Sequence, residues 1–147
     1  MTARARIGVG LVGFGTVGTG VVKIFQTNAA LIRRRVGVPV ELVRIADVDL
    51  KKDRGVEAPA GLLTNDYQAV LSDPTVDIVL ELVGGYDIAK KVILGAIAKG
   101  KSVVTANKAL LAAHGEEIYE AAARARVDLG FEASVGGGIP VIRALTE

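Results

Sequence analysis

The sequence contains no cysteine, no tryptophan and a single histidine, His114. The absence of cysteine excludes disulfides, thiolate zinc sites, iron–sulfur clusters and cysteine nucleophiles. One histidine is too few for a multi-histidine metal centre. Because no partner residue stands near His114 in the sequence, we expect it to be an ordinary helix-surface residue.

Aromatic residues are scarce at 4%, and 18 basic side chains nearly balance 16 acidic ones, for a net charge of +2. Few aromatic rings leave few stacking platforms, and a surplus of two charges is not a basic field, so nucleic acid is not expected as a partner. The longest apolar runs are strand-sized, well short of the roughly 20 residues that span a bilayer. With no signal-peptide pattern, the composition favours a cytoplasmic protein without a membrane partner.

A chain of 147 residues, 50% of them hydrophobic, is the size of one globular domain that folds around a hydrophobic core. No internal repeat or low-complexity tract interrupts it. Short β-branched runs alternate with longer segments of helical periodicity, which is typical of βαβ units. The sequence therefore predicts an α/β fold with a doubly wound parallel sheet of about five strands and helices on both faces.

The alternation also predicts the individual elements. Strands are expected at 7–12, 40–46, 76–83, 102–105 and 127–133. A helix is expected from Thr16 until Gly37 and Pro39 stop it, and others around 67–71, at 86–98 and at 107–126, the last broken near Gly115. The loop 136–140 enters a helix that the chain does not finish, so we expect a second, truncated domain to begin at 141–147.

The strongest motif is Gly13-Phe14-Gly15-Thr16-Val17-Gly18, between the first predicted strand and the first predicted helix. In that context G-x-G-x-x-G is the fingerprint of a Rossmann-type dinucleotide site. Gly13 permits the tight turn, Gly15 lets the backbone approach a pyrophosphate, and Gly18 lets the helix lie close to the strand. The alternative is a glycine-rich turn without a ligand.

Asp47 stands at the end of the second predicted strand, where such folds place a carboxylate that binds the adenine ribose. A carboxylate repels a 2′-phosphate and so favours NAD. Lys51, Lys52 and Arg54 follow closely and could neutralise that phosphate. A solvated turn is the other interpretation of Asp47.

Two further loops are predicted at the same edge of the sheet. Gly84 and Gly85 follow the third strand, and Thr105 and Lys108 belong to the loop after the fourth. Both loops can reach the nicotinamide end of a cofactor that crosses the sheet. Lys108 could orient a bound carbonyl or hydroxyl group, or it could be a solvated residue in the first turn of a helix.

Glu132 ends the fifth predicted strand and precedes a glycine-rich loop, 136–138. A carboxylate beside such a loop can surround a hard cation with oxygen atoms. A capping or otherwise hydrogen-bonded structural glutamate is the alternative.

Several segments together resemble the N-terminal half of homoserine dehydrogenase. They are 13–18, 45–47, 81–85, Val103-Val104-Thr105-Ala106-Asn107-Lys108-Ala109-Leu110-Leu111, and Phe131-Glu132-Ala133-Ser134-Val135-Gly136-Gly137-Gly138-Ile139-Pro140. The resemblance covers nearly the whole chain. Its Thr-Ala-Asn-Lys and Phe-Glu-Ala-Ser-Val segments are far more specific than the glycine fingerprint, which unrelated proteins share.

The resemblance implies an enzyme that uses NAD or NADP to interconvert L-aspartate 4-semialdehyde and L-homoserine, on the route to threonine and methionine. It makes 1–140 the NAD(P)-binding domain. The general acid-base residues and the contacts of a homo-oligomer would lie in a further domain, so the fragment alone should be inactive. Cofactor contacts are implied for Phe14, Thr16, Val17, Thr105 and Lys108, with Lys108 also near the reacting oxygen. A sodium site is implied at Glu132, Val135, Gly137 and Ile139.

One departure from the family pattern concerns the cofactor. Members that use NADP commonly place an arginine just after the aspartate, where this chain has Val48. Two alternative functions also fit the fold and the glycine loop. One is a non-catalytic module that senses NAD(H), and the other is a different small-substrate dehydrogenase.

Overall fold

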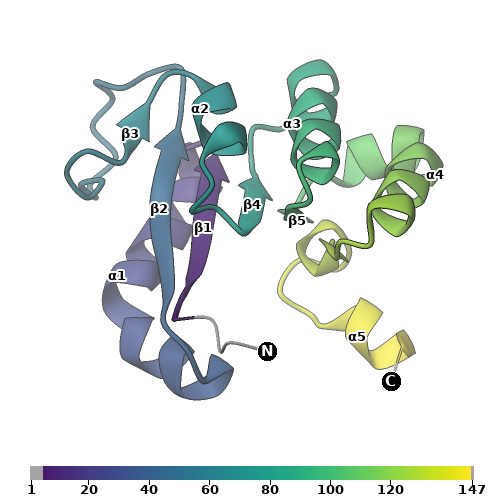
Figure 1. Ribbon diagram of the computed structural model, residues 1–147, viewed down its shortest axis with the longest axis horizontal. Helices are drawn as coiled ribbons and strands as arrows, with labels where there is room; N and C mark the ends of the chain where they lie inside the picture. Colours follow the sequence, from purple (N-terminus) through teal and green to yellow (C-terminus); the bar gives the residue numbers. More distant parts are fainter. Residues whose placement is uncertain (1–4, 147) are drawn as a thin grey trace.

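The computed structural model describes residues 5–146, whose strands form one parallel sheet with the order β3-β2-β1-β4-β5-β6 (Figure 1). Neighbouring strands run parallel at each of the five pairings, so their carboxyl ends meet at one edge. The strands are β1 (Ile7–Val12), β2 (Val40–Ala46), β3 (Leu63–Thr64), β4 (Ile78–Glu81), β5 (Ser102–Thr105) and β6 (Leu129–Gly130).

The helices lie on opposite faces because the sheet grows outward from β1 in two directions. The chain first adds β2 and β3 on one side of β1, and it then crosses back to add β4, β5 and β6 on the other side. Right-handed crossovers in opposite directions cover opposite faces of the sheet. The helices are α1 (Thr16–Val36), α2 (Tyr67–Ser72), α3 (Asp87–Ala98), α4 (Lys108–Ala125) and α5 (Val141–Thr146), with a 3₁₀ turn at Glu132–Ser134. The point where the strand order reverses lies between β1 and β4.

Two hydrophobic clusters follow from the alternation of side chains along the strands. Val12 and Val79 face α2, α3 and α4 and belong to the larger cluster. Leu11 and Ile45 face the other way and pack with Phe14 and with Val22 of α1. The doubly wound architecture is as predicted, but α1 and the loop 47–62 cover one face and three helices cover the other.

Most predicted boundaries are confirmed. β1, β2 and β5 have the predicted limits, and α1 begins at Thr16 and ends at Gly37, whose φ of 90° is left-handed. The sheet has six strands where about five were predicted, because the two-residue β3 carries no periodic pattern. β4 is shorter than predicted.

The last strand is the largest error, because the predicted strand 127–133 is reduced to Leu129–Gly130. Phe131 leaves the extended conformation with φ −137° and ψ 17°, and a 3₁₀ turn begins at Glu132. Glu132 therefore does not end a strand.

His114 marks the predicted break in α4, since its φ of −133° and ψ of 16° are not helical. Its surroundings differ from the isolated surface position that was expected. Its Nδ1 lies 3.4 Å from Nζ of Lys90 on α3, and the same Nζ pairs with Glu117 at 2.6 Å. The hydrogen bond from Lys90 holds the pKa of Glu117 below its ordinary value. Across residues 5–146, no helix is long and apolar enough to cross a membrane.

Candidate functional site

The glycine loop between β1 and α1 has a backbone path that side chains would block. Gly13 has a φ of +102°, and a Cβ there would lie 2.5 Å from the carbonyl carbon of Leu82. A Cβ at Gly18 would lie 2.1 Å from the carbonyl oxygen of Gly13, so the helix packs directly on the turn. A Cβ at Gly15 would meet nothing within 4 Å. The loop is therefore closed on its inner side and open at Gly15.

The start of α1 beside Gly15 is suited to an anion. Gly15 is the N-cap residue, no side chain caps this end, and no acidic residue stands in the first turn. The first N–H groups of a helix have no intrahelical partners and carry partial positive charge. Such an end binds phosphate groups without any basic side chain.

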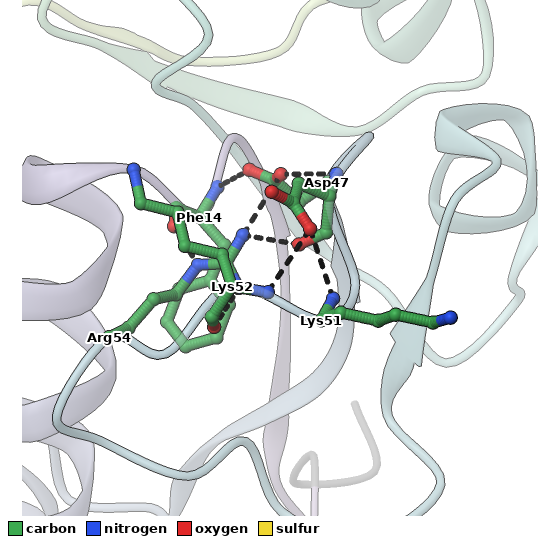
Figure 2. A network of polar contacts seen from close by, with 6 residues as sticks. Phe14, Asp47, Lys51, Lys52 and Arg54 are labelled. Atoms are coloured by element: carbon green, nitrogen blue, oxygen red, sulfur yellow. Dashed lines mark hydrogen bonds and ion pairs between the residues drawn. The ribbon is translucent and has the colours of Figure 1, made fainter.

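Asp47 follows β2 and lies against the glycine loop, where its carboxylate already has three donors (Figure 2). Oδ2 accepts from the N–H of Phe14 at 2.6 Å, and Oδ1 accepts from the N–H of Asp49 at 2.9 Å and from Nη2 of Arg54 at 3.0 Å. The Arg54 guanidinium also stacks on the Phe14 ring, 4.6 Å from its centroid, and donates to the Phe14 carbonyl oxygen.

The surroundings of Asp47 differ from those that the sequence predicts. The sequence predicts a carboxylate that binds a ribose, whereas in the structure the carboxylate pairs with the buried side chain of Arg54 and accepts a hydrogen bond from the backbone of Phe14. Of the three nearby basic residues, Arg54 is the one that contacts Asp47, whereas Figure 2 shows the Lys51 side chain pointing away.

The loops after β4 and β5 meet on the other side of the glycine loop. They enclose a cavity of about 300 Å³, whose lining includes Val17, Val83, Gly84, Asn107 and Lys108. Thr105 is fully buried beneath it, and Lys108 is the exposed first residue of α4. The structure thus brings the predicted residues of both loops to one place.

Two further hollows lie at the carboxyl edge of the sheet, and we refer to the three together as the cleft. One, of about 280 Å³, is lined mainly by apolar groups and shares Leu82 and Val83 with the first cavity. The other, of about 220 Å³, is lined by Gly15, Thr16, Lys52 and Arg54. All three have lining residues in the glycine loop or the first turn of α1.

Several residues of this cleft were not identified from the sequence. Asn65, Tyr67 and Ile88 line the hollow beside Asp47, and Glu81 lies under the loop after β4. The available signal was their position near the carboxyl ends of β3 and β4: Asn65 follows β3, Glu81 ends β4, and Tyr67 and Ile88 lie in the first turns of α2 and α3. The sequence pattern did not show which of them point into the cleft.

Glu132 is a capping residue in this structure. Its Oε1 accepts from the N–H of Ile142 at 2.9 Å and its Oε2 from the N–H of Arg143 at 3.0 Å, both at the start of α5. Val135, Gly137 and Ile139 lie in the loop between, where Gly136 and Gly137 have φ values of +70° and +62°. Within residues 5–146, no group of three or more acidic or histidine side chains gathers as a metal site.

The strand order, the glycine turn and the uncapped start of α1 at the reversal point define a Rossmann-class dinucleotide-binding domain. A family model described as "Homoserine dehydrogenase, NAD binding domain" matches residues 13–132. The chain belongs to this family.

Known relatives extend the match to nearly the whole chain. The homoserine dehydrogenase of Bacillus subtilis is 45% identical over 141 residues, which are 96% of this chain and 33% of the relative. That of Corynebacterium glutamicum is 48% identical over 139 residues, 95% of this chain and 31% of the relative. The crystal structure of a homoserine dehydrogenase from Thiobacillus denitrificans matches with a TM-score of 0.90 and 47% identity, covering 97% of this chain and 33% of that one. The chain spans about a third of the length of these relatives.

Proposed function

We propose that this chain binds NAD(H) or NADP(H) in the cleft at the carboxyl edge of the sheet and is the cofactor-binding part of a homoserine dehydrogenase. The observation that carries the proposal is the uncapped start of α1 beside the open side of Gly15. A ligand with a pyrophosphate between two larger groups matches an anion site that has a hollow on either side.

Each part of the cleft has a role in this proposal. The N–H groups at Thr16 and Val17 bind the pyrophosphate, and Gly15 leaves space for it. Asp47 and Phe14 lie beside the adenosine half, with the apolar hollow next to them for the adenine ring. Gly84 and Thr105 flank the nicotinamide half.

The proposed reaction is the reversible reduction of L-aspartate 4-semialdehyde to L-homoserine. The bound cofactor supplies or accepts the hydride. Lys108 acts in this chain as a catalytic residue, because its exposed ammonium group at the cavity can hold the reacting oxygen by charge and hydrogen bonding. We further propose that acid-base groups and homo-oligomer contacts lie outside residues 1–140, in a cytoplasmic enzyme.

The structure favours binding of both cofactors over a strict choice of NAD. Asp47 alone would repel a 2′-phosphate, but Arg54 compensates its charge, and Lys52 lines the adjoining hollow. Val48 supplies no charge there and is 93% exposed. NADH and NADPH are therefore both proposed ligands.

A sodium ion is proposed at Glu132, with the carbonyl groups of Val135, Gly137 and Ile139. The donor chemistry fits, because one carboxylate with neutral carbonyls matches a singly charged ion better than calcium. A carboxylate offers about four lone-pair positions, so capping α5 leaves Glu132 able to contact an ion. The left-handed glycines let this loop turn its carbonyls inward.

Two experiments test the function. Calorimetric titration of the chain with NADH and with NADPH should give saturable binding at one site, and absence of binding by either overturns the cofactor assignment. The full-length gene product should oxidise one of the two when aspartate semialdehyde is added. Binding without such activity favours the alternative of an NAD(H)-sensing module.

A further inference from the structure

Glu81 is a fully buried carboxylate at the carboxyl end of β4, between the loops that follow β4 and β5. Its Oε1 accepts from the N–H groups of Val83 at 2.9 Å and Gly84 at 3.2 Å. Its Oε2 accepts from the hydroxyl of Thr105 at 2.6 Å. All three partners donate, so Glu81 acts as the acceptor in each of these bonds.

The network continues beyond Glu81. The N–H of Asn107 donates to the Thr105 hydroxyl oxygen at 3.0 Å, and the same hydroxyl donates to Oε2 of Glu81. The Asn107 side chain forms a second bridge between the loops, because its Nδ2 donates to the carbonyl oxygen of Gly85 at 2.7 Å. Its Oδ1 accepts from the N–H of Leu110 and caps α4.

The network therefore controls the shape of the cavity that receives the nicotinamide in the proposed function. Val83 and Gly84 form one wall, and Asn107 and Lys108 form the other. Lys108 follows the capping Asn107 directly, so a shift of one loop relative to the other also moves the start of α4. Ser134 extends the network by donating to the Thr105 carbonyl oxygen at 2.9 Å.

A space-filling role does not explain a carboxylate at this buried position, because removing a carboxylate from water costs free energy. Even for buried ion pairs, replacement by apolar residues of similar volume is often neutral or stabilising. A buried acceptor with several donors instead restricts the backbone to one arrangement, because any other arrangement leaves a polar group unpaired. This favours a role in geometry over a role in packing.

We propose that Glu81 is a positioning residue for the nicotinamide half of the cofactor: it ties the loop after β4 to Thr105 and so holds the two walls of the cavity and Lys108 in their working arrangement. The inference rests on the proposed function. It concerns one end of the ligand, whereas the anion site at α1 concerns the middle.

Glu81→Gln tests the proposal, because an amide that accepts from Val83 and Gly84 presents its NH₂ group to Thr105, whose hydroxyl then loses its acceptor. Calorimetry with NADH and with ADP-ribose, which lacks the nicotinamide, separates the two ends of the site. We expect Glu81→Gln to weaken NADH binding about tenfold and to leave ADP-ribose binding within about twofold. Asp73→Asn is the matched control, since it neutralises a hydrogen-bonded carboxylate at the opposite edge of the sheet and should leave both affinities unchanged.

The outcomes separate this inference from the proposed function. Failure of the wild-type chain to bind NADH and ADP-ribose overturns the proposed function. Wild-type binding of both, with Glu81→Gln weakening both equally or neither, overturns the positioning role alone. Hydrogen exchange of the wild type adds a measurement that needs no variant: the amides of Val83 and Gly84 should be strongly protected despite their loop position, and exchange at the rate of free loop amides overturns the proposal.

Discussion

Arg54 and Asp47 form an ion pair beside the glycine loop, with Nη2 3.0 Å from Oδ1 and with only 5% and 15% of the two side chains exposed (Figure 2). Solvent screens such a pair less than it screens an exposed one. The charge that would disfavour a 2′-phosphate is therefore compensated within the protein. On the proposed function, we therefore expect the choice between NAD and NADP to depend on the pair and not on Asp47 alone.

Replacing Arg54 by methionine should shift cofactor preference toward NADH. Methionine keeps an unbranched apolar chain against Phe14 but leaves the charge of Asp47 uncompensated. We expect the ratio of NADPH to NADH affinity to fall about fivefold, equivalent to about 1 kcal/mol, measured by calorimetry. Arg35→Met removes the same charge at the far end of α1 and should leave the ratio unchanged. An unaltered ratio in Arg54→Met contradicts the proposed compensation.

The open side of Gly15 should be essential for dinucleotide binding but not for folding. In Gly15→Val the added Cβ has no atom within 4 Å apart from those of the adjacent residues, so the fold should survive while the pyrophosphate position is filled. Titration with NADH should show no measurable binding, and circular dichroism should match the wild type. Gly20→Val is the control, because Gly20 also faces open space but lies further along α1. Normal NADH binding by a folded Gly15→Val chain would show that the glycine loop is not part of the binding site.

The sequence predicted those elements whose pattern is local. β1, β2 and α1 have clear hydrophobic patterns. Gly37 ends α1 because the backbone there takes a left-handed φ, which glycine adopts readily. β3 has two residues and no such pattern, and its pairing with β2 comes from tertiary structure. Elements this short are outside the reach of periodicity.

The site shows the same division. The roles of Gly13 and Gly18 in the turn follow from the motif, because they depend on backbone geometry close in sequence. The bond between Glu81 and Thr105 joins residues 24 positions apart, and the bond between Arg54 and Phe14 spans 40. The sequence offered no pattern to pair those side chains, and it left the orientation of Asp47 undetermined.

Acid should destabilise the chain partly through Asp73. The hydrogen bond from the Thr75 hydroxyl, at 2.6 Å, is the main cause that holds the pKa of Asp73 below its ordinary value of 3.8, and Arg44 adds to it. A lowered folded-state pKa contributes stability that is present above the ordinary value and is lost as pH falls through the folded-state value.

The matching measurement compares the wild type with Asp73→Asn by urea unfolding between pH 7 and about pH 2. At pH 7 the variant should be less stable by about 1 kcal/mol. Below about pH 4 the difference should shrink, because the wild-type carboxyl is then protonated as well. A difference that stays constant to the lowest pH would show that the charge of Asp73 is not involved.

Lys108 should matter for turnover and not for folding. It is an exposed first residue of α4, and such residues contribute little to stability, within about 0.5 kcal/mol. In the full-length gene product we expect Lys108→Ala to lower kcat about 100-fold with the melting temperature nearly unchanged. Lys108→Arg should recover only part of the rate, because a planar guanidinium does not occupy the place of a compact ammonium group. Lys91→Ala, on the exposed surface of α3, is the control and should keep wild-type kinetics. Normal kcat and KM in Lys108→Ala would show that Lys108 is a solvated residue without a catalytic role.

Glu132 makes two separable contributions if the sodium proposal is correct. As a cap it accepts from Ile142 and Arg143, and this contribution does not depend on which salt is present. As an ion ligand it adds stability only when an ion of suitable size is bound to the folded chain.

Thermal melting in sodium, potassium and tetramethylammonium chloride at equal ionic strength therefore distinguishes the capping contribution from the ion-binding contribution. We expect sodium to raise the wild-type Tm by about 3 °C over tetramethylammonium, and Glu132→Gln to lose that difference. Glu116→Gln, an exposed carboxylate on α4, should keep it. Equal Tm values of the wild type in all three salts, with Glu132→Gln lower by the same amount in each, would leave Glu132 as a helix cap without an ion.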